Sequence, residues 1–251
     1  MDDRPVSRVS PAPPGRVGLI RHAETAWSRE GRHTGRTDIP LTPEGERQAA
    51  LLAAALTGHH FVLVATSPRI RAVRTADLAG LVPSRPGGPA AASGGGMGAG
   101  GGGRPASPPA PAPALVDRRE IWPELAEWDY GDYEGLTTQR IREDVPGWTV
   151  WTGPVPGGES AEQVGARADT VLARLEPILD SGDVALVGHA HMLRVLIARW
   201  LGLAPTAGAC FVLDPAGWSE LGREHGTRAL LRLNVGVEGA VALRKAGPGP
   251  R

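Results

Sequence analysis

Short apolar runs alternate with longer stretches of helical character along this chain of 251 residues. Runs of four or five apolar residues, closed by small or polar ones, are typical of strands buried on both faces. They predict strands near 16–22, 61–66, 114–118 and 184–188, with closing segments near 209–214 and 228–235. Helices are predicted from Pro43 to about 57, from Pro68 to about 81, and over 137–144, 160–180 and 192–201. The alternation predicts an α/β fold, a three-layer α/β/α sandwich with a mostly parallel central sheet.

Two of these helices begin with recognisable signals. Thr42 precedes Pro43, which is typical of an N-cap followed by proline at the first helical position. Ser160 is followed three residues later by Gln163, the pattern of a capping box. Between the first strand and the helix that follows it, residues 26–41 are predicted to form a loop over the end of the sheet.

Residues 83–114 interrupt the pattern, because all of them except Arg85, Met97 and Arg104 are Gly, Pro, Ala or Ser. Such a composition buries nothing and predicts a disordered loop. A flexible arm at 1–15 and a flexible tail at 245–251 are also predicted, so that one domain spans 16–244. The loop could tether a partner, but a neutral expansion is favoured because long surface insertions cost little stability.

Two histidines stand where predicted strands end. His22 follows the first strand in Leu-Ile-Arg-His-Ala-Glu-Thr, and His189 follows another in Val-Gly-His-Ala-His. The carboxyl ends of parallel strands form the rim at which ligands bind, so both imidazoles are expected at one site. No cluster with a third ligand accompanies His189 and His191 in the sequence, which argues against a metal pair.

Arginines surround this histidine pair. Arg21 precedes His22, and Arg71 and Arg74 lie one helical turn apart, so that at least one of them can point to the rim. A guanidinium group forks onto two phosphate oxygens and stays charged, which suits a phosphate site. An imidazole could attack phosphorus while the arginines offset the charge on the phosphoryl oxygens, without a metal.

The leaving group of such a reaction needs a proton, and an acidic cluster could supply it. Four carboxyl groups compete for this role on spacing alone: Glu127, Asp129, Asp132 and Glu134. A carboxylic acid that donates this proton must be protonated at the start, which predicts better activity on the acidic side of neutral.

Four motifs resemble the phosphoglycerate mutase-like branch of the histidine phosphatase superfamily. They are Arg-His-Ala-Glu-Thr at 21–25, Ser-Pro-x-x-Arg-Ala-x-x-Thr-Ala at 67–76, Glu-x-x-Tyr-Gly-x-x-Glu-Gly at 127–135 and Gly-His at 188–189. The resemblance implies a phosphoglycerate mutase-like fold over residues 17 to about 200. It also implies His22 as the phosphorylated nucleophile and Glu127 as the general acid, with Arg21, Arg71 and His189 around the phosphate. Ser28 stands where mutases typically have asparagine, which implies a shorter phosphate contact.

Within that family the chain is similar to small phosphatases, the actinobacterial acid phosphatases and the fungal sedoheptulose bisphosphatase type. Only about two dozen residues separate Gly135 from Glu159, where mutases usually carry a longer insertion that covers the site. Without a lid, the phosphohistidine should react with water. The resemblance therefore implies a metal-independent acid phosphatase that acts on small phosphorylated metabolites such as sugar phosphates. A phosphoglycerate mutase and a catalytically inactive phosphate-binding scaffold are the alternatives.

Composition excludes several other classes of function. The formal net charge is zero, so no broad basic face for nucleic acid or anionic membranes is expected. No apolar run approaches the roughly 18–20 residues of a membrane span, and residues 1–16 are polar, without the apolar core of a signal peptide. The single cysteine, Cys210, excludes an internal disulfide framework. We expect a cytoplasmic location, and a reaction that needs neither a metal nor a cofactor. The oligomeric state stays open, with a homodimer among the options.

Overall fold

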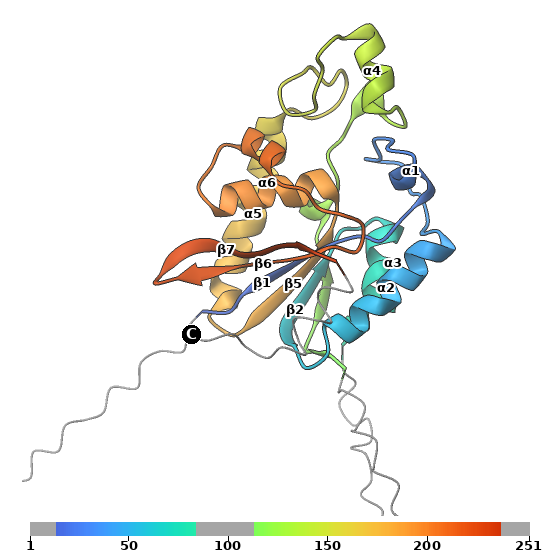
Figure 1. The fold of residues 1–251 in the computed structure, drawn as a ribbon. Coiled ribbons are helices and arrows are strands. Elements are labelled where there is room, and N and C mark those ends of the chain that lie inside the picture. The colour runs from blue at the N-terminus through green and yellow to red at the C-terminus, as the bar shows by residue number, and fades with distance from the viewer. Residues whose placement is uncertain (1–13, 84–112, 237–251) are drawn as a thin grey trace, which may run out of the picture.

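A computed structural model describes residues 14–83 and 113–236. The predicted arm at 1–15, the loop at 83–114 and the tail at 245–251 lie wholly or largely outside the described residues. The described part of the chain forms one seven-stranded sheet with helices on both of its faces (Figure 1). The strands are β1 (Val17–Arg21), β2 (His60–Thr66), β3 (Leu115–Val116), β4 (Arg119–Ile121), β5 (Asp183–Gly188), β6 (Trp218–Glu224) and β7 (Thr227–Val235).

The strand order is β3-β2-β5-β1-β6-β7, with β4 also paired to β2. The pairs formed by β1, β2, β3, β4 and β5 are parallel, whereas β6 pairs antiparallel with β1 and with β7. The mostly parallel sheet of the predicted sandwich is therefore confirmed. The antiparallel hairpin of β6 and β7 extends one edge of it.

Six α-helices and three short 3₁₀ turns connect the described strands. The helices are α1 (Ala26–Arg29), α2 (Pro43–Ala55), α3 (Ile70–Leu78), α4 (Thr138–Asp144), α5 (Ala161–Leu179) and α6 (Ala190–Trp200). The turns are η1 (Pro123–Leu125), η2 (Gly131–Tyr133) and η3 (Pro205–Cys210). None of the helices in this part of the chain is long and apolar enough to span a membrane.

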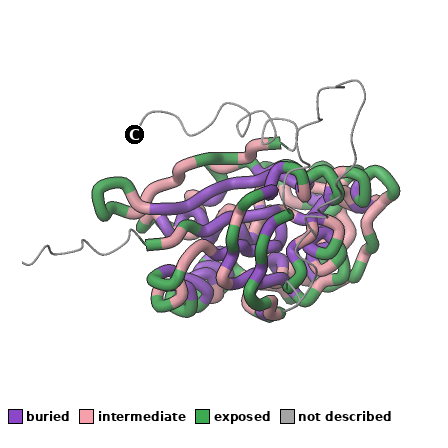
Figure 2. The backbone as a smooth tube through the Cα atoms, turned by 90° about the horizontal axis from the view of Figure 1, so that it is seen from below, coloured by how far each residue is buried: buried purple, intermediate pink, exposed green. Residues whose placement is uncertain are grey.

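The central strands contain continuous apolar runs because each of their faces is covered by helices. Successive side chains of a strand point to opposite faces. Leu19 and Leu186 accordingly pack with residues of α5 and α6, while Ile20 and Val187 pack with residues of α2 and α3. Figure 2 shows the buried segments gathered at the middle of the molecule, with exposed stretches around them. The two resulting cores hold the carboxyl edge of the sheet rigidly.

Both predicted helix starts are confirmed. The Thr42 side chain accepts a hydrogen bond from the backbone N–H of Gly45 at the start of α2. Ser160 and Gln163 form the complete capping box of α5, each side chain accepting from the other's backbone N–H. The short helix predicted at 137–144 is present as α4.

Other boundaries differ from the prediction because distant side chains decide them. The helix predicted from Pro68 begins at Ile70, whose N–H donates to the carboxylate of Asp38. The helix predicted at 192–201 begins at Ala190, where its first N–H groups meet Glu127. The predicted loop at 26–41 contains a one-turn helix, α1. The strand predicted at 114–118 is two short strands, β3 and β4.

The closing strand predicted at 209–214 is wrong. Backbone carbonyl groups in this region accept hydrogen bonds from arginine side chains rather than from a neighbouring strand. The carbonyl of Ala209 accepts from Arg194, and that of Leu213 accepts from Arg21. The strand that completes the sheet is β6, in which the buried Glu220 pairs with Arg16 and Arg232.

Candidate active site

The three central strands end at one edge of the sheet and bring both histidines together there. The backbone N–H of His22, after β1, donates to the carbonyl of Gly188 at 2.9 Å. His189 follows β5 directly, and Ser67 follows β2 with its N–H on the carbonyl of Val187. The ring centroids of His22 and His189 are 5.1 Å apart. The structure therefore places the two imidazoles at one site, where the strand ends were expected to meet.

His22 is held as a neutral ring with one nitrogen available. Its Nδ1 lies 2.8 Å from the carbonyl oxygen of Ala23, which can only accept, so Nδ1 carries the proton and Nε2 the lone pair. Burial lowers the pKa of His22 well below its ordinary value, and the charges of Arg71 and Arg21 add to this effect. A neutral imidazole with a free lone pair has the chemistry of a nucleophile.

His189 is fully buried and its tautomer follows from its neighbours. The Nε of Arg71 donates to its Nδ1 at 3.2 Å, because a guanidinium group has no acceptor. The proton therefore sits on Nε2, which lies 2.7 Å from the Oγ of Ser67. Burial, followed by the charge of Arg71, lowers the pKa of His189 well below its ordinary value. This ring too is neutral and acts as a hydrogen-bond donor.

Arg71 links His189 to the loop that crosses the site. Its side chain is fully buried, and it donates to the carbonyls of Thr34 and Thr37, both at 2.9 Å. Glu134 accepts from the N–H groups of Gly35 and Thr37 in the same loop. Arg74 lies apart from the site, half exposed and bonded to Glu46 of α2. Of the two arginines one turn apart, Arg71 is the one that reaches the histidines.

Arg21 brings a second guanidinium group, which has an N–H donor that is unpaired among the described residues. Its Nη1 donates to the carbonyl of Leu213 at 2.6 Å, but its buried Nε has no hydrogen-bond partner in the described structure. The same is true of the Nε of Arg69, whose charge also lowers the pKa of His189, after burial and other charges. Buried donors without partners are rare in native proteins and suit an anion. Sequence reasoning did not assign Arg69, although it stands within the Ser-Pro-Arg-Ile-Arg motif.

Glu127 is the carboxyl group that lies among these charges. Burial lowers the pKa of Arg21 and of Arg71, and the charge of Glu127 opposes both shifts more than any other group. Its Oε1 accepts from the N–H groups of Trp128 and Met192, both at 2.9 Å, and its Oε2 accepts from that of His191 at 3.1 Å. Two of these donors belong to the first turn of α6, the positive end of the helix dipole.

The competing acids are engaged elsewhere. Asp129 pairs with Arg36 and accepts from the N–H of Gly131, and Glu134 supports the loop at 34–37. Asp132 is exposed. The structure thus separates four carboxyl groups that spacing alone left equivalent, and places Glu127 with the arginines.

The hydroxyl of Ser28 is used within α1. It accepts from the N–H of Thr25 at 2.9 Å and donates to the Thr25 carbonyl at 3.0 Å, which completes a capping box. A phosphate contact of Ser28 stays a prediction. No group of three His, Cys, Asp or Glu side chains within the described residues could hold a metal ion.

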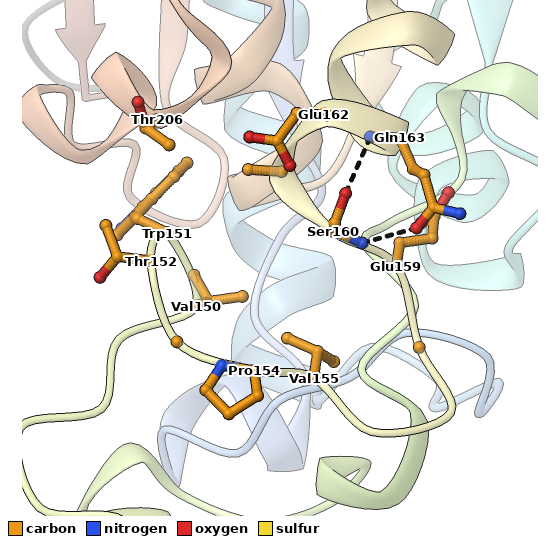
Figure 3. A pocket seen from close by; sticks show the side chains of 13 residues that line it. Val150, Trp151, Thr152, Pro154, Val155, Glu159, Ser160, Glu162, Gln163 and Thr206 are labelled. Atoms are coloured by element: carbon orange, nitrogen blue, oxygen red, sulfur yellow. Dashed lines mark hydrogen bonds between the residues drawn. The ribbon is translucent and has the colours of Figure 1, made fainter.

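Aromatic rings border the site on the side of α6. The Tyr130 hydroxyl lies 2.6 Å from Nδ1 of His191, and the ring of Trp151 packs against His191 with centroids 5.2 Å apart. Trp151 also lines a cavity of about 550 Å³ beside the start of α5, together with Val155 and Glu162 (Figure 3). His191 therefore belongs to α6 and to this aromatic wall, not to a strand.

Three buried histidines and one half-buried histidine make the fold sensitive to acid. Burial lowers the pKa of His22, His33, His189 and His191, and that of His33 falls to about 4. In the unfolded chain each ring takes a proton near pH 6.5, so the unfolded state binds more protons and stability falls as the pH drops below that value. His33 alone should account for about 3 kcal/mol between pH 6.5 and pH 4.

Urea unfolding at pH 7.5, 6 and 5 measures this effect. The free energy of unfolding should fall steeply below pH 6.5, and less steeply in a His33→Asn variant. A His60→Asn variant, which changes an exposed histidine, should keep the wild-type slope. A free energy that stays constant from pH 7.5 to 5 would show that these rings take up protons in the folded state.

Known proteins match this chain in sequence and in fold. The model of the histidine phosphatase superfamily, branch 1, matches residues 17–85 and 112–236. An acid phosphatase of Mycobacterium tuberculosis is 40% identical over 223 residues, 88% of this chain and 92% of the relative. Sedoheptulose 1,7-bisphosphatase of Saccharomyces cerevisiae is 30% identical over 208 residues, 74% of this chain and 67% of the relative. A 2,3-bisphosphoglycerate-dependent phosphoglycerate mutase of Cytophaga hutchinsonii also matches, at 26% identity over 195 residues, 74% of this chain and 78% of the relative.

A solved structure of a Mycobacterium tuberculosis open reading frame superposes with a TM-score of 0.71 at 37% identity, covering 89% of this chain and 98% of that one. The chain belongs to the histidine phosphatase superfamily, branch 1. The resemblance drawn from the four motifs is confirmed, and so are the phosphoglycerate mutase-like fold and the phosphatase class of enzyme.

Proposed function

We propose that this protein is a metal-independent phosphomonoesterase of the acid phosphatase type, acting on small phosphorylated metabolites such as sugar phosphates in the cytoplasm. The observation that carries the proposal is the buried His22, whose Nδ1 lies on the carbonyl of Ala23 and whose pKa is lowered by burial and by the charges of Arg71 and Arg21, so that Nε2 keeps its lone pair. Neutral imidazole can attack phosphorus, and the guanidinium groups can stabilise the charge that develops on the phosphoryl oxygens.

In the first step the lone pair of His22 Nε2 forms a bond to phosphorus. The bond between phosphorus and the ester oxygen breaks, and its electron pair leaves with that oxygen. The carboxyl group of Glu127 gives its proton to the leaving oxygen, so that an alcohol departs and a phosphohistidine remains. Arg21, whose Nε has no hydrogen-bond partner in the described structure, can donate to the phosphoryl oxygens.

In the second step the Glu127 carboxylate takes a proton from water while the water oxygen bonds to phosphorus. The bond between phosphorus and Nε2 breaks, its electron pair returns to His22, and inorganic phosphate leaves. The ester and one water are thus converted to an alcohol and phosphate. Glu127 ends protonated, ready for the next ester.

Hydrolysis is favoured over phosphoryl return for two reasons. The segment between η2 and α5 contains only the seven-residue helix α4 and turns, which offers little to exclude water. The most similar of the relatives described above carries the name acid phosphatase. A phosphoglycerate mutase is the alternative, supported by the mutase among the relatives. An inactive scaffold is disfavoured because Arg21, His22, Arg71, Glu127 and His189 are all present.

Phosphate release from a panel of esters tests the proposal. The panel contains p-nitrophenyl phosphate, 3-phosphoglycerate and sedoheptulose bisphosphate, and each reaction includes a chelator. Chelator-resistant release is expected, and the preferred ester identifies the substrate class. Isomerisation of 3-phosphoglycerate that depends on a bisphosphorylated primer, with no phosphate release, would support the mutase. If no ester reacts, the remaining hypothesis is a catalytically inactive phosphate-binding scaffold.

A further inference from the structure

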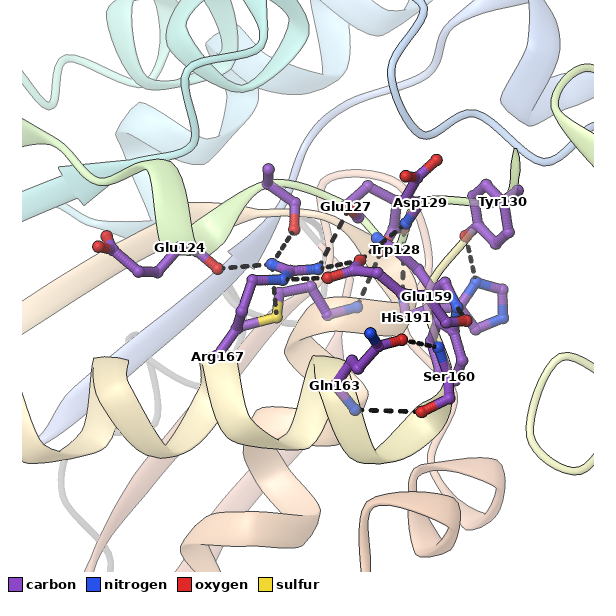
Figure 4. Close-up of polar contacts among 12 residues, drawn as sticks. Glu124, Glu127, Trp128, Asp129, Tyr130, Glu159, Ser160, Gln163, Arg167 and His191 are labelled. Carbon is purple, nitrogen blue, oxygen red and sulfur yellow. Dashed lines mark hydrogen bonds and ion pairs between the residues drawn. The ribbon is translucent and has the colours of Figure 1, made fainter. Parts of the chain in front are cut away.

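The segment that carries Glu127 has little secondary structure of its own. The turn η1 ends at Leu125, and the chain then runs without helix or strand to η2. Backbone N–H and C=O groups in such a segment need partners from elsewhere, because leaving them unpaired when buried is costly. Figure 4 shows that two residues, Glu159 just before α5 and Arg167 within α5, supply many of these partners.

Arg167 holds the first half of the segment. Its Nη1 donates to the carbonyls of Glu124 at 2.8 Å and Ala126 at 2.9 Å, and its Nη2 donates to that of Glu127 at 3.4 Å. Its Nε and Nη2 also form a two-pronged ion pair with Glu159, both contacts at 2.7 Å. A guanidinium group has five N–H donors, and here each has an acceptor. A lysine ammonium has three donors and no planar fork.

Glu159 holds the second half. Its carboxylate accepts from the N–H of Asp129 at 2.9 Å, and its own N–H donates to the Asp129 carbonyl at 2.9 Å. Its carbonyl accepts from the indole N–H of Trp128 at 2.8 Å. Arg167 and Glu159 together therefore form hydrogen bonds to the backbone on both sides of Glu127.

We propose that Arg167 and Glu159 are positioning residues for Glu127, an inference that rests on the proposed function. The carboxyl group of Glu127 accepts hydrogen bonds from N–H groups in the first turn of α6, while its backbone carbonyl accepts one from Arg167 of α5. The ion pair sets how far the carboxyl group extends toward the leaving oxygen. Displacements on the order of 1 Å at a reacting group cost large factors in rate.

A second ion pair provides a matched control. Arg199 of α6 forms the same two-pronged pair with Asp169 of α5, at 2.8 and 3.1 Å. It is partly exposed, like the pair of Arg167 and Glu159, but it joins α6 to α5, and Arg199 donates to Asp169 and to the carbonyl of Leu203 rather than to the Glu127 segment. The loss of a two-pronged ion pair as such should therefore appear in variants of both arginines, whereas a loss of positioning should appear in variants of Arg167 only.

The test compares two aryl esters of similar shape with different needs for a proton. Phenolate is a poor leaving group and depends on the general acid, whereas 2,4-dinitrophenolate leaves without protonation. In Arg167→Lys, kcat/KM for phenyl phosphate should fall about 30-fold, and for 2,4-dinitrophenyl phosphate less than about 3-fold. Glu159→Gln should change the ratio in the same direction, and Arg199→Lys should keep the wild-type ratio.

The ratio of the two kcat/KM values does not depend on how much of a variant is folded. Equal losses on both esters in Arg167→Lys and Glu159→Gln, or the same ratio change in Arg199→Lys, would overturn the inference and leave a purely structural ion pair. A wild-type protein that releases phosphate from neither ester would instead overturn the proposed function itself. The two failures are thus distinguishable.

Discussion

Replacing His22 with alanine should lower phosphate release by at least about 10⁴-fold, because it removes the atom that bonds to phosphorus. Arg21, Arg71 and His189 would still bind the phosphate, so weak binding of inorganic phosphate should persist. The measurement is release from the preferred ester of the panel, compared in wild type and variant. The wild type should also form an acid-labile, base-stable phosphohistidine that His22→Ala lacks.

The control for this variant is another histidine at a strand. His60 begins β2, is about half exposed and pairs with Asp117. His60→Ala should therefore keep turnover within about 2-fold of wild type, as is usual for surface substitutions. If folded His22→Ala keeps a tenth or more of the wild-type rate, His22 is not the nucleophile, and the ring of His189 becomes the group to test.

Replacing Glu127 with glutamine should lower turnover by about 10²–10⁴-fold, the usual contribution of general acid–base catalysis. The amide cannot give a proton to the leaving oxygen or take one from water. Its NH₂ group would also meet the N–H of His191, which now donates to Oε2. With 2,4-dinitrophenyl phosphate, which needs no acid in the first step, the phosphohistidine should accumulate in this variant.

The dependence on pH gives a second readout of the same role. A carboxylic acid that gives its proton in the first step predicts better activity on the acidic side of neutral and a decline on the alkaline side. His22 stays neutral on the acidic side because burial depresses its pKa. Glu127→Gln should lose this alkaline decline. A wild-type rate that climbs steadily to pH 9, or a variant that turns over phosphohistidine normally, would contradict the assignment.

The fold could be predicted where the pattern of the chain is local. Strands β1, β2 and β5 contain continuous apolar runs because helices cover both of their faces, so these strands could be found without an alternating pattern. The starts of α2 and α5 depend on side chains within three residues. The strand β6 could not be predicted, because Glu220 interrupts its apolar pattern. That carboxylate is tolerated in the interior only through Arg16 and Arg232.

The candidate site divides in the same way. The order of the motifs and the strand ends predicted that His22 and His189 meet, and the structure places their rings 5.1 Å apart. The choice among four acids could not be made from spacing. It depends on N–H groups of α6 that lie more than sixty positions further along the chain from Glu127.

By itself, the sequence determined the class of fold, the residues at the ends of the central strands and the family to which they belong. These features depend on short-range patterns of burial and capping, which a chain expresses before it folds. Only the tertiary structure decided that Arg71 sets the tautomer of His189, that Glu127 lies with the arginines, and that Arg167 and Glu159 hold it there. Each of these contacts joins donors and acceptors that only folding brings within hydrogen-bond distance, and burial is what makes pairing them necessary.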